Sequence, residues 1–257
     1  MSYFRLIYRV MGLLLIQPIM GLACLVTAMA LFPFKKLHYT MIARVMQLWG
    51  KLCCWVLNIG IHRSGSDERL DDGGLIVSNH VGSVDIFVMA ACFRMSFVSK
   101  SDIRTWPLAG YMTRVANTIY IDRDRRRGVK VMIQAITARL KLGHYVVVFP
   151  EGRATSGYQV EHFNSSAFEA VVQAKSSVIP VMIRFSDAGE PSVACWPDGI
   201  SFMANLKRLL MHPRLNVHVW VFPAIRGETD RRVLAEKSRV LISEKYEEEK
   251  GSLAAKL

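Results

Sequence analysis

The chain has 257 residues, of which 51% are hydrophobic and 21% charged, so it can bury a core and is neither disordered, collagen-like nor a small disulfide scaffold. Its 33 basic and 21 acidic residues give a net charge of +12, which predicts an anionic partner: nucleic acid, anionic lipid or an acidic substrate. The five cysteines have no C-x-x-C spacing, which argues against a disulfide framework or zinc site and predicts buried, reduced thiols.

The N-terminal segment is uncharged from Val10 to Phe34, a run of 25 residues, and about 20 residues suffice to cross the hydrocarbon of a bilayer. The run is too long for a cleaved signal peptide and lacks an A-x-A-type exit. Pro18 predicts a kink within the run. Two interpretations remain open, a transmembrane helix and a kinked anchor that stays in one leaflet, because basic residues flank both ends.

The stretch from His38 to Leu57 is also apolar and predicts an amphipathic or partly buried helix. Its two tryptophans, Trp49 and Trp55, have near-helical spacing and suit a membrane interface. The alternative is that both N-terminal helices simply pack on the globular domain.

The rest of the chain alternates predicted strands with predicted helices, and a polar, Gly-rich turn follows a strand end near Gly60. The strands are expected at 75–77, 97–98, 118–121, 145–149, 178–185 and 215–222. The helices are expected at 83–93, 107–116, 129–140, 165–174 and 229–249. This order predicts an α/β fold with a mixed, largely parallel sheet flanked by helices. We expect membrane-anchoring helices in 1–58, the α/β domain in 59–227 and a charged helix in 228–257.

His80 and Asp85 follow the first predicted strand of this domain and open its first helix. At a strand end, Asp85 can hold one tautomer of His80 and stabilise its imidazolium form. The pair predicts a general base that activates a substrate hydroxyl directly, since neither a G-x-S-x-G elbow nor a persuasive cysteine nucleophile is present. His62 and Asp67 have the same spacing but lie in a Ser/Gly-rich stretch, so we interpret them as coincidence.

Polar residues also follow three other predicted strands. Glu151 and Gly152 come after 145–149, where the glycine allows a backbone N–H to approach a ligand closely. Arg123 comes after 118–121 and suits bidentate binding of phosphate. Lys100 comes after 97–98 and is a second candidate for binding an anion.

Four blocks in the order Asn79-His80-x-x-x-x-Asp85, Ile121-Asp122-Arg123, Phe149-Pro150-Glu151-Gly152 and Val178-Ile179-Pro180-Val181 together resemble the motifs of the glycerolipid acyltransferases. This family contains the 1-acyl-glycerol-3-phosphate acyltransferases and their relatives. The resemblance covers about Leu75 to Val181, and the hydrophobic N-terminus is also similar. It implies a glycerol-3-phosphate acyltransferase-like fold and acyl transfer from acyl-CoA or acyl-carrier protein to a lysolipid hydroxyl, without a cofactor.

The resemblance also implies roles for individual residues. His80 would be the base and Asp85 its partner. Arg123 would bind the acceptor phosphate, with Lys100 as a further phosphate contact. The remaining positions are Glu151 and Gly152, which would shape the acceptor site, and Pro180, which would form the acyl-side wall.

The third block departs from the family pattern, which usually continues Thr/Ser-Arg after the glycine. Here Arg153 follows the glycine directly and is succeeded by Ala154-Thr155, so the guanidinium is displaced by one residue. Arg153 remains a candidate for substrate binding. The run Glu151-Gly152-x-x-x-Ser156-Gly157 also resembles relatives that acylate lyso-ornithine lipid, whose headgroup has no phosphate. The second block departs too, with Asn117 and Tyr120 where the family usually has Gly and Phe.

The leading hypothesis is therefore a lysophosphatidate acyltransferase in phospholipid biosynthesis, bound to the cytoplasmic leaflet of a bacterial inner membrane. The close alternative is acylation of lyso-ornithine lipid or another lysolipid. A non-catalytic basic protein that binds membrane or nucleic acid is the alternative from another class, and it leaves His80 and Glu151 unexplained. We expect no nucleic-acid partner and no metal, because the histidines and acidic residues do not form a ligand set.

Overall fold

The computed structural model describes residues 2–67, 73–122, 125–187, 191–197 and 199–254, without the side chains of 252–254. In this part of the chain, seven strands form one sheet in the order β1-β7-β6-β2-β5-β3-β4. The strands are β1 (Ile59–Gly65), β2 (Gly74–Ser78), β3 (Met95–Lys100), β4 (Ile119–Ile121), β5 (Tyr145–Val148), β6 (Val178–Phe185) and β7 (Leu215–Val221). Strands β2 to β6 are parallel, whereas β7 is antiparallel to β6 and parallel to β1. The predicted mixed, largely parallel sheet is confirmed.

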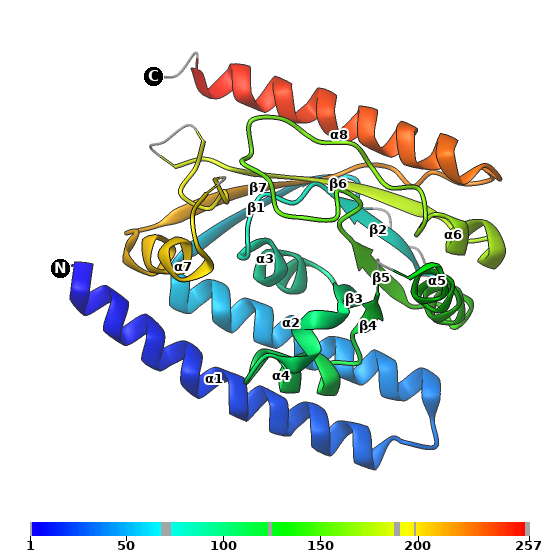
Figure 1. Ribbon diagram of the computed structural model, residues 1–257, viewed down its shortest axis with the longest axis horizontal. Coiled ribbons are helices and arrows are strands. Elements are labelled where there is room, and N and C mark those ends of the chain that lie inside the picture. The colour runs from blue at the N-terminus through cyan, green and yellow to red at the C-terminus, as the bar shows by residue number, and fades with distance from the viewer. Residues whose placement is uncertain (1, 68–72, 123–124, 188–190, 198, 255–257) are drawn as a thin grey trace.

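Helices cover both faces of the sheet (Figure 1). They are α1 (Ser2–Ala30), α2 (Lys35–Leu57), α3 (Asp85–Cys92), α4 (Ala109–Val115), α5 (Arg126–Lys141), α6 (Glu169–Ala174), α7 (Phe202–Met211) and α8 (Arg231–Ala254), with a 3-10 turn η1 at Ser101–Thr105. Side chains alternate along each strand. Within β2, Ile76 belongs to a hydrophobic cluster that includes residues of α1, α2, α3, α4 and α7. Leu75 and Val77 belong to a second cluster that includes residues of α5, α6 and α8.

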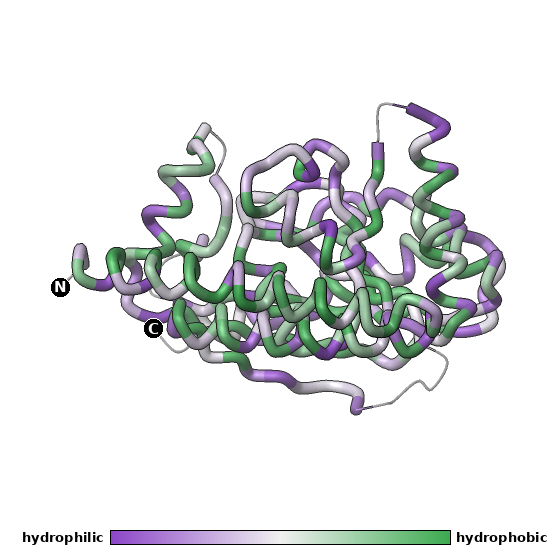
Figure 2. Tube along the Cα trace, turned by 90° about the horizontal axis from the view of Figure 1, so that it is seen from below, coloured by the Kyte–Doolittle hydropathy of each residue, from purple (hydrophilic) through white to green (hydrophobic). Residues whose placement is uncertain are grey.

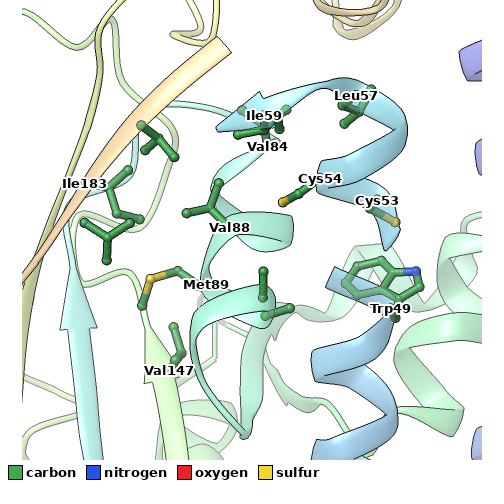
Figure 3. Packing of buried hydrophobic residues seen from close by; sticks show 14 of the residues in the cluster. Trp49, Cys53, Cys54, Leu57, Ile59, Val84, Val88, Met89, Val147 and Ile183 are labelled. Atoms are coloured by element: carbon green, nitrogen blue, oxygen red, sulfur yellow. The ribbon is translucent and has the colours of Figure 1, made fainter. Parts of the chain in front are cut away.

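Helix α3 lies between α2 and the sheet and joins them into one core (Figure 3). Its residues Val88 and Met89 are fully buried between Cys53 and Cys54 of α2 and strand residues such as Val147. All five cysteines are free thiols, and all but Cys92 are fully buried, as predicted. Trp49 is buried as well, and its indole N–H donates to Gln17 Oε1 of α1 at 3.0 Å, so this tryptophan packs inside the protein.

Helix α1 is continuous through Pro18 and rests on the body of the protein along one side. Near its middle, Gly21 lies against Tyr111 of α4. Near its start, Arg9 is only 1% exposed. Its guanidinium donates to the carbonyl oxygens of Leu210, His212 and Pro213, at 3.1, 2.6 and 3.1 Å, where α7 ends. The partial negative charge at a helix C-terminus stabilises a buried cation there.

The opposite side of α1 exposes a continuous apolar stripe. Figure 2 shows from below that hydrophobic residues predominate along the two N-terminal helices. Among the described residues, α1 is the one helix long and apolar enough to cross a bilayer, by length and composition. The stripe consists of Phe4, Ile7, Met11, Leu14, Leu15, Ile19, Leu22, Leu25, Val26 and Met29. Helix α1 therefore has one side docked on the protein and one apolar side exposed.

The other predicted elements are present with ends shifted by a few residues, and the 3-10 turn η1 was not predicted. Three further differences are larger. Strand β1 is seven residues long, where we expected only a strand end. Helix α7 was not predicted, although Ser201 caps its N-terminus by accepting a hydrogen bond from the Ala204 N–H at 3.3 Å. The helix expected from residue 165 begins only at Glu169 in α6, after a turn.

Candidate active site

The polar residues singled out in the sequence gather where parallel strands end. Strands β2, β5, β3 and β4 are neighbours and point the same way, so their carboxyl ends form one edge of the sheet. His80 follows β2, Glu151 follows β5, and Lys100 is the last residue of β3. The sheet therefore brings residues from distant parts of the chain to a common edge.

His80 and Asp85 form a hydrogen-bonded pair at this edge, with Nδ1 of the imidazole 2.8 Å from Oδ2 of the carboxylate. The Asp85 side chain is fully buried and the His80 side chain is 17% exposed. A carboxylate accepts hydrogen bonds, so it favours the tautomer with the proton on Nδ1 and leaves Nε2 as the nitrogen that can take a proton. The His80 ring stacks on Phe149, with centroids 4.2 Å apart, which fixes the plane of the ring.

The loop between the two residues also binds the Asp85 carboxylate. The backbone N–H groups of Val81 and Gly82 donate to Asp85 Oδ2 at 2.7 and 3.0 Å. These bonds stabilise the negative charge of a carboxylate that has no access to water. Gly82 is required here by packing, because a Cβ at this position would lie 1.9 Å from the Ala194 carbonyl oxygen.

The backbone of His80 is held on both sides. Its N–H donates to Glu151 Oε2 at 2.8 Å. Its carbonyl oxygen accepts from the N–H and the hydroxyl of Thr155, at 2.9 and 3.1 Å. One residue earlier, the Asn79 side-chain amide exchanges two hydrogen bonds with the backbone of Ile183 on β6, at 2.8 and 2.9 Å. The position of the imidazole is therefore set by contacts from β6 and from the loop after β5.

Both carboxylate oxygens of Glu151 accept backbone hydrogen bonds, one from His80 and the other from the Glu161 N–H at 3.0 Å. Burial raises the pKa of Glu151 from 4.5 to about 7, although these two hydrogen bonds act in the opposite direction. The sequence predicted that Glu151 shapes the acceptor site. In the structure, its contacts are with the backbone around His80.

The raised pKa of Glu151 predicts how protein stability depends on pH. Between about pH 4.5 and 7 the folded protein keeps on Glu151 a proton that the unfolded chain has released, so the contribution of Glu151 to stability falls as pH rises through this window. Burial lowers the pKa of His144 from 6.5 to about 4, and this shift acts in the opposite direction in the same range. The full shift corresponds to roughly 3 kcal/mol in the free energy of unfolding by pH 8. Glu151→Gln removes this contribution, so the stability of the parent relative to this variant should fall between pH 5 and pH 8, as measured by urea unfolding of the full chain in detergent. Glu244→Gln, at an exposed position on α8, is the control and should behave as the parent. Identical pH dependence in all three proteins would contradict the assignment.

The other candidate residues have different surroundings. Lys100 is about half exposed, and its Nζ lies 2.6 Å from Asp102 Oδ2. Arg153 is exposed, and Gly152 occupies a turn with φ of +83°, a conformation that favours glycine. Pro180 is buried inside the sheet on β6, opposite Val77 of β2. Arg123 lies outside the described residues.

Several residues that support the site were not identified from the sequence. Asn79 and Phe149 belong to the recognised motif blocks, so their positions were visible but their contacts were not. Thr155 lies where the third block departs from the family pattern. The backbone N–H of Trp196 donates to the carbonyl oxygens of Val81 and Thr155, at 2.8 and 3.2 Å. No sequence pattern predicted this contact. Within the described parts of the chain, no cluster of three or more His, Cys, Asp or Glu side chains could hold a metal ion.

Comparison with known proteins places this geometry in a family. The acyltransferase family model matches residues 59–184. A 1-acyl-sn-glycerol-3-phosphate acyltransferase from Neisseria meningitidis is 34% identical over 70% of this chain and 72% of its own length. The chain belongs to this acyltransferase family. The resemblance read from the four motif blocks is thereby confirmed.

Two further relatives define the range of the family around this chain. A Neisseria gonorrhoeae protein of the same name is 33% identical over 54% of this chain and 54% of its own length. A lyso-ornithine lipid O-acyltransferase from Rhodobacter capsulatus is 30% identical over 67% of this chain and 63% of its own length. Proteins with both names therefore resemble this acyltransferase at nearly the same level of identity.

The fold has a solved counterpart. The crystal structure of the 1-acyl-sn-glycerophosphate acyltransferase PlsC from Thermotoga maritima superposes with a TM-score of 0.72 and 18% identity, over 97% of this chain and 98% of the other. The match includes the region of α1 and α2 as well as the sheet domain. The predicted glycerol-3-phosphate acyltransferase-like fold is confirmed.

Proposed function

We propose that this acyltransferase moves a fatty acyl group from acyl-CoA or acyl-carrier protein to the free hydroxyl of 1-acyl-glycerol-3-phosphate, forming phosphatidate. The observation that carries the proposal is the His80–Asp85 pair at the carboxyl edge of the sheet, with a 2.8 Å hydrogen bond on Nδ1. This arrangement leaves Nε2 as a base for a hydroxyl. The relatives named for this reaction support the choice of acceptor.

The proposed reaction uses one base and no covalent enzyme intermediate. His80 Nε2 takes the proton of the acceptor hydroxyl while the hydroxyl oxygen attacks the thioester carbonyl carbon. Asp85 stabilises the imidazolium ion that forms. The tetrahedral intermediate then expels the thiol, which takes the proton from Nε2 as the C–S bond breaks. The products are the acylated acceptor, which is an ester, and the free thiol of the donor. His80 is again a neutral imidazole.

Substrate binding is proposed for the residues that follow the neighbouring strands. Arg123, Lys100 and Arg153 are the basic side chains for an acceptor phosphate. Gly152 and Glu151 stay assigned to the acceptor side of the site. We assign Pro180 to the acyl-side wall of the site, as the family resemblance implies, although it lies within the sheet.

We also propose that residues 1–58 hold the enzyme on the cytoplasmic leaflet of a bacterial inner membrane, with 59–227 as the acyltransferase domain and 228–257 as a C-terminal helix. The exposed apolar stripe of α1 supports the membrane contact. The docked side of α1 favours the one-leaflet interpretation over a separate transmembrane span, because a spanning helix would have to release the buried Arg9. The net charge of +12 adds attraction to anionic lipid.

Lyso-ornithine lipid is the second candidate acceptor. The displaced Arg153 favours it, because that headgroup has no phosphate to bind. Similarity to several lyso-ornithine lipid O-acyltransferases supports it as well. The chemistry at His80 is the same for both acceptors.

The test is acyl transfer by the purified full chain in detergent. Acyl-CoA and acyl-carrier protein are supplied separately, each with lysophosphatidate and with lyso-ornithine lipid. Product from lysophosphatidate supports the proposal. Product only from lyso-ornithine lipid reassigns the acceptor, and absence of product from all four pairs rejects both.

Arg153→Ala tests phosphate recognition. If the guanidinium binds the acceptor phosphate, its loss should raise the KM for lysophosphatidate about tenfold or more and leave kcat nearly unchanged. Arg232→Ala, an exposed arginine on α8, is the matched control and should leave both values as in the parent. An unchanged KM in Arg153→Ala removes this residue from phosphate binding.

A further inference from the structure

A second exposed apolar patch lies at the start of α7 and in the turn before α4, and it comes from two segments far apart in the sequence. Trp106 and Leu108 precede α4 and are 43% and 42% exposed, whereas Phe202 and Met203 open α7 and are 37% and 68% exposed. The rings of Trp106 and Phe202 meet edge to face, with centroids 5.6 Å apart. We name these four residues the α4–α7 patch.

The backbone at Leu108 is unusual and keeps this side chain outside. Leu108 has φ of +57° and ψ of −56°, and the Ala109 N–H bonds to the Pro107 carbonyl oxygen at 2.5 Å. This is a γ-turn with positive φ, which is rare and strained for a residue with a side chain. A strained turn that presents leucine to the outside beside an exposed tryptophan suits a surface with an apolar partner.

The two helices that carry or follow the patch residues are both docked on α1, which carries the exposed stripe. Helix α1 contacts both α4 and α7. Arg9 fixes α1 to the end of α7, and Gly21 of α1 lies against Tyr111 of α4. The stripe and the patch are therefore held in a fixed relation to each other.

The surroundings of the patch are basic. Residues 201–214 contain no acidic residue. Lys207, Arg214 and Arg104 are exposed on the two segments, and the nearby acidic side chain of Asp102 is paired with Lys100. An apolar, tryptophan-containing surface with basic residues around it complements an anionic lipid interface.

The patch is also connected to the candidate active site. The centroid of the Trp196 ring lies 5.7 Å from that of the Phe202 ring, and the backbone N–H of Trp196 donates to the Val81 carbonyl oxygen. Val81 is the residue directly after His80. A bilayer that contacts the patch would lie within reach of the loop that carries the base.

We propose that the α4–α7 patch is a second bilayer contact, which inserts into an anionic leaflet together with the α1 stripe. This inference rests on the proposed membrane association and adds to it the part of the surface that faces lipid. Two contacts fix the orientation of the enzyme on the membrane, whereas α1 alone would allow rotation about its own axis. Lysolipid acceptors then enter from the leaflet at the side of the protein where His80 lies.

The experiment places an environment-sensitive fluorophore at single cysteines of the full chain. Met203→Cys tests the patch, Leu15→Cys tests the α1 stripe, and Glu244→Cys on α8 reports the face across the sheet. The background carries Cys92→Ser, because the other native cysteines are buried. The vesicles contain phosphatidylglycerol and phosphatidylethanolamine with brominated acyl chains as quenchers.

We expect quenching of at least twofold at positions 203 and 15, and none at 244. Quenching at 15 without quenching at 203 would overturn the second contact and leave membrane association intact. No quenching at any position would reject both, and acyl transfer in detergent tests the catalytic proposal separately. As a second variant, Phe202→Ser/Met203→Ser should weaken partitioning into these vesicles about tenfold. Its unfolding transition shows whether it is folded, and unchanged partitioning of the folded variant would also overturn the proposal.

Discussion

Replacing His80 by alanine should lower kcat for acyl transfer by about 10²- to 10⁴-fold, the range expected for loss of a general base. Acceptor binding should change little, because Nε2 acts on the proton of a hydroxyl that other residues position. The measurement is steady-state transfer with the acceptor and donor found active, in the same detergent as the parent protein. Vesicle binding should be unaffected, because α1 and the α4–α7 patch are intact.

The sequence supplies a matched control for this variant. His62 and Asp67 repeat the spacing of His80 and Asp85, but His62 lies on β1, at the far edge of the sheet from β3 and β4. His62→Ala should therefore retain parent activity. If His80→Ala kept more than a tenth of the parent kcat, His80 would not be the general base.

Replacing Asp85 by asparagine should lower kcat roughly 10³-fold with little change in shape. His80 Nδ1 and the N–H groups of Val81 and Gly82 all bond to Oδ2, so asparagine places its amide oxygen there and loses the negative charge that stabilises the imidazolium ion. The fully buried carboxylate also accepts from the N–H groups of Val81 and Gly82. The amide N–H₂ then takes the buried position of Oδ1, which has no hydrogen-bond partner, and this should cost about 1–3 kcal/mol in the free energy of unfolding.

The two effects of Asp85→Asn are separated by measuring kcat on protein that is shown to be folded. Urea unfolding gives the stability, and the rate is taken well below the transition. Asp67→Asn, exposed after β1, should change neither quantity. A folded Asp85→Asn protein with at least a third of the parent kcat would show that the base does not need the negative charge of Asp85.

The central part of the fold could be predicted because its signals are local. Strands β2, β5 and β6 are continuous apolar runs, since parallel strands are covered on both faces, and helix α5 shows one apolar face at helical spacing. The elements that were missed depend on distant partners. Strand β1 has mostly exposed side chains and exists through pairing with β7, about 150 residues later. Nothing in the local pattern states that β7 runs antiparallel to β6.

The candidate site divides in the same way. His80 and Asp85 are five positions apart and lie in a strand–loop–helix unit, so their contact follows from spacing. The bond between the His80 N–H and Glu151 joins residues 71 positions apart and depends on the order of β2 and β5 in the sheet. The Trp196 contact depends on the loop before α7, which the sequence pattern did not reveal. Spacing therefore predicted the hydrogen-bonded pair of His80 and Asp85, and only the tertiary structure shows what holds the pair in place.

Arg9 has a consequence for the biogenesis of the protein. Its carbonyl partners at the end of α7 lie 201 to 204 positions later in the chain. At roughly 5–20 residues per second, the ribosome makes α1 about 10 to 40 seconds before the segment that binds this guanidinium. During that time α2 can pack on α1, but the Arg9 guanidinium lacks its carbonyl partners, and the bilayer surface can receive the exposed apolar stripe. The unpaired arginine opposes full insertion, since a charge within the hydrocarbon is costly. Arg9 would thus keep the nascent helix at the interface until the last strand of the sheet is made and the enzyme assembles on the membrane.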